Sequence, residues 1–95
     1  MPSVTFSISW PDGETVQYYS PSTIIYEFLE VKKPYSHDEF FNQVTRGLDA
    51  ASNRVMQKFG YACSAAADEK RKITRKLESL TRNNINGQIS VCAMS

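Results

Sequence analysis

The sequence predicts a small α+β domain in which a three-stranded antiparallel sheet carries two main helices on one face, in the order β-β-α-α-α-β. Apolar and polar residues alternate over residues 3–10, 14–19 and 88–94, as in strands with one buried side. Over residues 36–59 and 64–82, apolar residues instead recur every three or four positions, as in amphipathic helices. A chain of 95 residues, 41% apolar and 22% charged, has the size and composition of one globular domain spanning residues 1–95.

The first two predicted strands form a hairpin. Every second residue from Val4 to Trp10 is apolar, so one face of the first strand is expected to be buried. Pro11-Asp12-Gly13 then supplies a turn, because proline presets φ and glycine accepts a positive φ. Alternation resumes over residues 14–19, and the two strands are therefore expected to pair antiparallel.

Two helices follow the hairpin. Ser20 is expected to cap a short helix that ends near Val31. Ser36 and Glu39 form an S-x-x-E capping box that opens a long helix, and Gly60 is placed to end it. The predicted core-facing seam of the long helix consists of Phe41, Val44, Leu48, Ala51, Val55 and Phe59.

The C-terminal part of the sequence predicts one more helix and one strand. Ser64 is expected to cap this helix, and Lys70 interrupts its apolar face. The residues of that face are Ala66, Ile73, Leu77 and Leu80. The strand is expected to turn Ile89, Val91 and Ala93 inward.

Composition excludes several classes of protein. The start of the chain has neither a basic segment nor an apolar run, so no signal peptide is expected and a cytoplasmic location is predicted. No apolar stretch is long enough to span a membrane. His37, Cys63 and Cys92 lack the spacing of a metal site, and no metal or cofactor is predicted.

Four short stretches carry a resemblance to a known family. They are Trp10-Pro11-Asp12-Gly13, Tyr19-Ser20-Pro21-Ser22, Leu48-x-x-Ala51-Ser52-x-Arg54-Val55 and Gly60-Tyr61-Ala62-Cys63-Ser64. In this order and spacing, the chain resembles the small nitrogen-starvation-response proteins of bacteria from about residue 4 to residue 67.

The resemblance implies a physiological context. It places the gene beside those of a nitrilase, a radical-SAM protein, an acetyltransferase and a flavin oxidoreductase. No catalytic role carries over to any residue. Tyr18 stands where members of that family often have a cysteine, which argues against a two-cysteine redox mechanism.

Cys63 is the candidate for a reactive thiol. It lies at the predicted start of a helix, where unpaired amide groups and the helix dipole favour a thiolate. A nucleophile also needs a base nearby, and His37, the one histidine, lies at the other end of the long helix. The alternative, which the missing base favours, is that Cys63 is a buried packing residue.

Four residues are candidates for contact with a protein partner. Trp10 and Asp12 lie in the predicted hairpin turn, and Tyr19 and Tyr26 lie off the predicted core positions. Tyrosine and tryptophan are frequent at interfaces, because each joins an apolar body to a polar group. For Trp10 the stronger interpretation is a core residue, because it continues the inward face of the first strand.

Positive charge concentrates in the last predicted helix. Residues 1–45 contain six acids and two lysines, a charge of −4, whereas residues 46–95 contain nine bases and four acids, a charge of +5. Lys72, Arg75 and Lys76 are candidates for contacts with nucleic-acid phosphates. The favoured alternative is a solvated face, with Asp68 pairing with Lys72 and Glu78 with Arg82 across four residues.

The leading functional hypothesis from the sequence is a non-enzymatic accessory protein. It binds either the product of a neighbouring gene in a nitrogen-starvation or nitrilase-linked cluster, or a second copy of itself. The alternatives are an enzyme or carrier that uses the Cys63 thiol, and a nucleic-acid-binding protein that uses the last helix. The sequence contains no paired acid and base, phosphate-binding loop or metal cluster that would favour catalysis.

Overall fold

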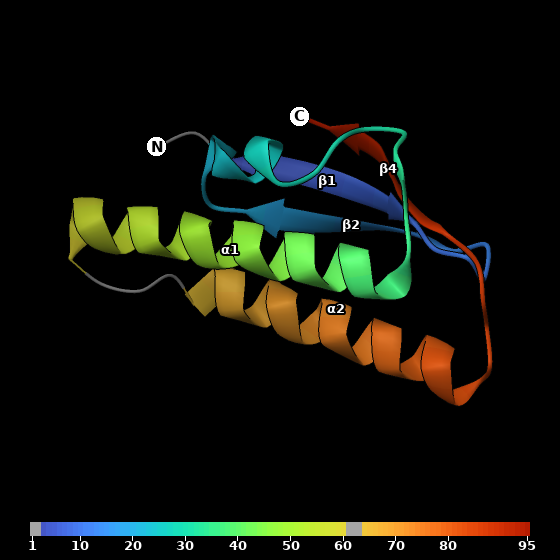
Figure 1. The fold of residues 1–95 in the computed structure, drawn as a ribbon. Coiled ribbons are helices and arrows are strands. Elements are labelled where there is room, and N and C mark those ends of the chain that lie inside the picture. Colours follow the sequence, from blue (N-terminus) through green and yellow to red (C-terminus); the bar gives the residue numbers. More distant parts are fainter. Residues whose placement is uncertain (1–2, 61–63) are drawn as a thin grey trace.

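The structure, a computed structural model, describes residues 3–60 and 64–95. These residues form an antiparallel sheet with two long helices on one face (Figure 1). The predicted α+β class and the two helices on one face are confirmed. The elements are β1 (Val4–Ser9), β2 (Thr15–Ser20), the 3-10 helix η1 (Thr23–Glu27), β3 (Pro34–Tyr35), α1 (His37–Phe59), α2 (Ser64–Arg82) and β4 (Ile89–Met94).

The sheet has four strands among the described residues, in the order β2-β1-β4-β3, rather than the predicted three. The predicted hairpin of β1 and β2 is present, with Val4 opposite Ser20. The strand that the prediction missed is β3, which has only two residues. β3 exists because Tyr35 pairs with Ile89 of β4, far away in the sequence, so no local alternation announces it.

Because of a β-bulge, one residue of β4 lies on the opposite face from the one predicted. Ser7 lies opposite Ala93, but Ile8 lies opposite Val91, so Cys92 is the extra residue between two adjacent positions of β1. As a result Ala93 is exposed instead of facing inward, whereas Val91 is buried as predicted.

The buried face of α1 is rotated slightly from the predicted seam. Phe40 is fully buried, whereas Phe41 is 39% exposed. The seam ends at Val55, and Phe59 is 49% exposed. The prediction that Phe41 and Phe59 face the core is therefore wrong. The residues of α1 that are buried are Phe40, Val44, Gly47, Leu48, Ala51 and Val55.

The segment before β3 also differs from its prediction. The expected helix capped by Ser20 is a five-residue 3-10 helix, η1, whose cap is Ser22. The Ser20 hydroxyl instead donates to the Ser22 carbonyl oxygen at 2.7 Å. η1 packs on α1 at Gly47, where an added Cβ would clash with the Ile25 side chain. The missing side chain of Gly47 therefore lets the two helices approach closely.

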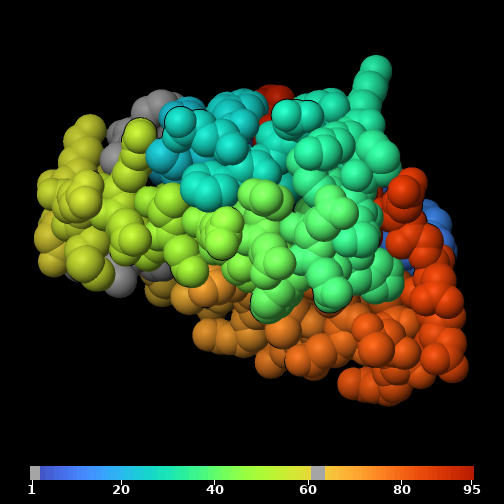
Figure 2. Space-filling view, in the orientation of Figure 1, coloured from blue at the N-terminus to red at the C-terminus, as the bar shows by residue number. Residues whose placement is uncertain are grey.

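The two long helices lie alongside each other on the sheet. In α2, Ala66, Ile73 and Leu80 are buried as predicted. Lys70, which interrupts that face, donates to Asp49 of α1 at 2.7 Å and so ties the helices together. No other described segment covers the line along which α1 and α2 meet on the face seen in Figure 2.

Candidate functional site

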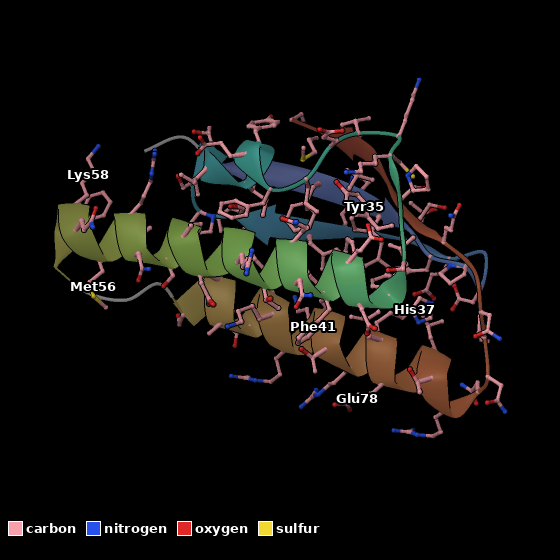
Figure 3. All side chains as sticks on the ribbon, viewed as in Figure 1. Tyr35, His37, Phe41, Met56, Lys58 and Glu78 are labelled. Atoms are coloured by element: carbon pink, nitrogen blue, oxygen red, sulfur yellow. The ribbon has the colours of Figure 1, made fainter. Side chains whose placement is uncertain are left out.

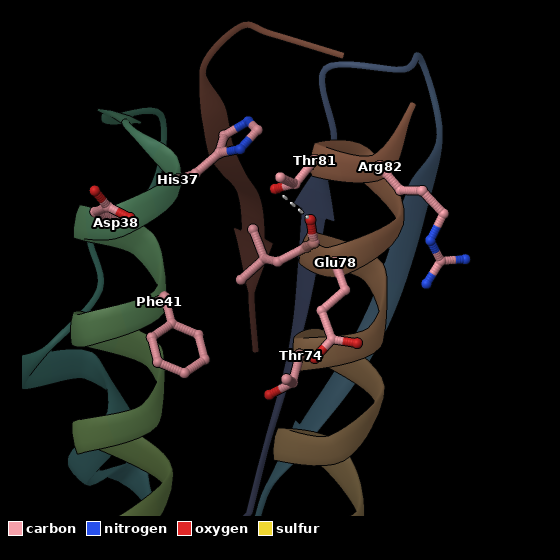
Figure 4. A pocket seen from close by; sticks show the side chains of 8 residues that line it. His37, Asp38, Phe41, Thr74, Glu78, Thr81 and Arg82 are labelled. Carbon is pink, nitrogen blue, oxygen red and sulfur yellow. Dashed lines mark hydrogen bonds between the residues drawn. The ribbon is translucent and has the colours of Figure 1, made fainter. Parts of the chain in front are cut away.

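A groove of about 490 Å³ lies between the N-terminal half of α1 and the C-terminal half of α2 (Figure 4). Its size is that of an ordinary ligand- or peptide-binding site. We call it the α1–α2 groove. Its lining consists of His37, Asp38 and Phe41 from α1 and Thr74, Leu77, Glu78, Thr81 and Arg82 from α2.

Helix geometry brings these side chains together. The Ser36 side chain accepts a hydrogen bond from the Glu39 amide at 3.2 Å, so the predicted N-cap is present and fixes where α1 begins. His37 and Phe41 are then four residues apart on one side of α1. The residues of α2 in the groove are likewise spaced three and four apart, which places them on one side of α2.

The wall of the groove is mainly apolar. The Phe41 ring reaches from α1 toward α2 (Figure 4), and Leu77 of α2 also lines the groove. The Thr74 and Thr81 hydroxyls donate to carbonyl oxygens of their own helix, at 2.8 and 3.1 Å. Because both hydroxyl groups already donate within α2, the two threonines do not require a hydrogen-bond acceptor from a molecule bound in the groove.

Three polar groups in the groove lack partners within the described chain. The buried Nε2 atom of His37 has no hydrogen-bond partner there. Glu78 and Arg82, both exposed, make no ion pair with any described residue. Because Nε2 of His37 is out of reach of solvent, the exposed Glu78 and Arg82 side chains are the groups with which a partner in the groove can pair.

The groove lies near the start of α1 and far from the last turns of that helix. Figure 3 shows Phe41 and Glu78 near one another, at a distance from Met56 and Lys58 in the last turns of α1. Among the described residues, therefore, the exposed Phe41 ring and the unpaired charges of α2 belong to one local surface.

Two of the predicted partner-binding residues, Trp10 and Asp12, lie beside Lys76 of α2; Trp10 is buried in the core and Asp12 is exposed at the surface. Trp10 is only 2% exposed and packs edge-on against Tyr18 and Phe40, with ring centres 6.3 and 5.4 Å away. This is the core position that the sequence favoured. Asp12 accepts a hydrogen bond from Lys76 at 2.5 Å, and the Lys76 ammonium lies 5.9 Å from the centre of the Trp10 ring.

Tyr19 and Tyr26, the other predicted partner-binding residues, are 36% and 46% exposed. Neither lines the α1–α2 groove. Tyr19 lies on β2 and Tyr26 on η1, so they come from different elements. Their contact with a partner remains a prediction.

One lysine of α2 forms ion pairs with two carboxylates in and after the hairpin turn. Lys76 donates to Asp12 and, at 3.1 Å, to Glu14. The hydrogen bond from Lys76, together with one from the Glu14 amide, lowers the pKa of the Asp12 carboxyl. Desolvation is the largest influence on Lys76 and lowers its pKa, but the hydrogen bonds to Asp12 and Glu14 outweigh it and raise the pKa overall. This cation and its carboxylates therefore stabilise each other's charged forms.

The other predicted nucleic-acid contacts lie on the same helix. Lys72 pairs with Glu69 at 3.5 Å, and Arg71 pairs with Asp68 at 3.2 Å. These pairs span three residues, instead of the predicted four-residue pairing of Asp68 with Lys72. The predicted ion pair of Glu78 with Arg82 is absent from the described contacts. Arg75 has no ion pair with a described residue. Most cations of this face are thus partly neutralised within the chain.

Cys63, the predicted reactive thiol, lies outside the described residues. Cys92 is an exposed free cysteine at the bulge of β4. In the part of the chain that the structure describes, no three His, Cys, Asp or Glu side chains gather where they could hold a metal ion. None of the helices in these residues has an apolar stretch long enough to cross a bilayer.

Sequence reasoning missed the α1–α2 groove. The spacing of three residues to Val44 predicts a core position for Phe41, but Phe40, four residues before Val44, is the buried ring. The spacing of four residues predicts that Glu78 pairs with Arg82 and so hides both charges from a search for a site. The only local signal was that two phenylalanines competed for one inward position at the start of α1.

Fold and groove together define a small α+β protein with an open, largely apolar surface between two helices. A family model described as nitrogen starvation-induced protein NitG matches residues 5–94. The chain therefore belongs to this family, as the four sequence stretches implied. No curated protein and no solved structure matches the chain.

Proposed function

We propose that this protein acts during nitrogen starvation as a non-enzymatic accessory protein, and that its binding surface is the α1–α2 groove. The family to which the chain belongs supports the physiological setting. The partner is a protein of the same response, such as the product of a neighbouring nitrilase-linked gene, or a second copy of the chain. The proposed location is the cytoplasm of a bacterial cell.

The exposure of Phe41 in the groove is the observation that carries this proposal. Phe41 is 39% exposed and lines the groove with Leu77, so part of its apolar surface is in contact with water. Burial of that surface by a partner is favourable. Aromatic anchors in apolar pockets with a polar rim are typical of interaction hot spots. His37, Glu78 and Arg82 supply the polar rim here.

Affinity capture from cross-linked, nitrogen-starved cells tests the proposal. Phe41→Glu places a charge in the groove, whereas Val31→Glu places the same charge on an apolar residue of similar exposure, 43%, outside it. The wild type and Val31→Glu should capture the same specific partner, and Phe41→Glu should lose it. Retention of that partner by Phe41→Glu, with an unchanged far-ultraviolet circular dichroism spectrum, would contradict the proposal.

A further inference from the structure

The surface around the α1–α2 groove combines an exposed aromatic side chain, a hollow and charges of both signs. It offers an exposed aromatic side chain, Phe41, beside a hollow of about 490 Å³. A surface that carries both a projection and a hollow can pair with its own copy. Such pairing requires that each contact be made twice, because a two-fold interface is isologous.

The charges on α2 satisfy this requirement. Glu78 and Arg82 both line the groove, both are exposed, and neither has an ion-pair partner among the described residues. They are four residues apart, which is about 6 Å along a helix. If two copies of α2 lie antiparallel about an axis midway between these residues, each glutamate meets the arginine of the other copy.

The other cations of α2 are either paired or outside the groove. Lys70, Arg71, Lys72 and Lys76 already pair with carboxylates of their own chain, and Arg75, which has no ion pair with a described residue, does not line the groove. Phe41 and Leu77 lie beside Glu78 in the groove, so an apolar centre is next to the proposed ion pairs. Ion pairs at the edge of an apolar contact give register and specificity.

We propose that a second copy of this chain occupies the α1–α2 groove, in a two-fold dimer in which Glu78 of each copy pairs with Arg82 of the other. This inference rests on the proposed function, since it names the occupant of the same surface. It also predicts that the pairing can be broken and rebuilt by exchanging the two charges.

Charge exchange in the purified full chain provides the test. Glu78→Arg leaves two arginines facing two arginines in a homodimer, and Arg82→Glu leaves two glutamates facing two glutamates. Mixing the two variants restores both ion pairs in a heterodimer. Arg46→Glu is the control, because Arg46 is exposed on α1 and does not line the groove.

Sedimentation equilibrium measures the outcome against the 10.8 kDa mass of the chain. At about 0.1 mM, where a micromolar Kd gives mostly dimer, the wild type and Arg46→Glu should have twice that mass. Each groove variant alone should dimerise at least about tenfold more weakly, the effect of a 1.4 kcal/mol loss. Their equimolar mixture should recover a dimer that contains one copy of each.

Two results would overturn the inference. If the wild type is a monomer at this concentration, a second copy does not occupy the groove. The cell-capture comparison of Phe41→Glu with Val31→Glu then decides separately whether the groove binds another protein. If the wild type and both groove variants dimerise equally and the mixture gains no heterodimer preference, the dimer uses a different surface.

Discussion

Phe40 and Phe41 are adjacent and chemically identical, yet they occupy opposite environments. An α-helix turns by about 100° per residue, so neighbours point in different directions. Phe40 is fully buried and its ring contacts Trp10 and Tyr35. Phe41 is 39% exposed and lines the α1–α2 groove. The first residue therefore contributes to stability, and the second is available for binding.

Alanine substitution should separate these two contributions. Phe40→Ala removes a fully buried ring and is expected to lower the free energy of unfolding by about 3–5 kcal/mol. Phe41→Ala removes a half-exposed ring, and the monomer should lose less than about 1 kcal/mol. Urea denaturation at low protein concentration measures both. Equal losses would mean that the two rings share one environment.

Gly47 matters for packing because it has no side chain. An added Cβ would clash with the fully buried Ile25 side chain and lie 3.2 Å from the Phe28 Cβ. Gly47→Ala is therefore expected to destabilise the protein by about 1–2 kcal/mol through overpacking, although alanine is the better helix former. Thermal unfolding checks this, with the exposed Asn53→Ala as a helix-propensity control. A stabilised Gly47→Ala variant would show that η1 and α1 are not closely packed.

At the scale of elements, the features that the sequence pattern does not predict are those that depend on contacts between distant segments. The hairpin, α1 and α2 were predictable, because each shows its own periodicity and its own stop or start signals. β3 was not, because its two residues become a strand only by pairing with β4. The bulge at Cys92 was not, because it depends on register against β1. The groove was missed for the same reason, since it exists only where two helices meet.

Lys76 connects one element to another, and its contacts predict a pH dependence. Its hydrogen bond lowers the pKa of Asp12 below the ordinary value of 3.8. A carboxyl whose folded pKa is lowered stabilises the fold above its unfolded pKa, and this contribution disappears as the pH falls through the folded pKa. The contact between α2 and the hairpin turn should therefore weaken in acid, as Asp12 becomes protonated, and again in strong base, as the pH rises through the raised pKa of Lys76.

Lys76→Met tests that contact while keeping an apolar stem of similar length. The pKa of Asp12, followed by NMR of its carboxyl carbon, should rise toward 3.8 in the variant. The stability difference between wild type and variant should be larger at about pH 6 than at about pH 2, because protonated Asp12 no longer attracts the ammonium. An unchanged Asp12 pKa in Lys76→Met would remove Lys76 as the cause.

At the scale of the whole molecule, one face of the sheet is buried under the helices, whereas the boundary between the helices is open to solvent. The helices cover one face of the sheet and bury Val4, Phe6, Ile8 and Trp10 of the first strand and turn. On their outer side, α1 and α2 leave the α1–α2 groove open along their boundary (Figure 2). A chain that belongs to a nitrogen starvation-induced family thus presents one of its exposed aromatic side chains, Phe41, at a junction of two helices.

Photo-cross-linking in nitrogen-starved cells tests most directly whether the α1–α2 groove is the binding surface. The photoreactive residue p-benzoylphenylalanine would replace Phe41 in one strain and Val31, outside the groove and similarly exposed, in another. We expect position 41 to give one discrete cross-linked product, which mass spectrometry identifies as a second copy or another protein, and position 31 to give none. A discrete product from position 31 and none from position 41 would contradict the assignment of this groove as the binding surface.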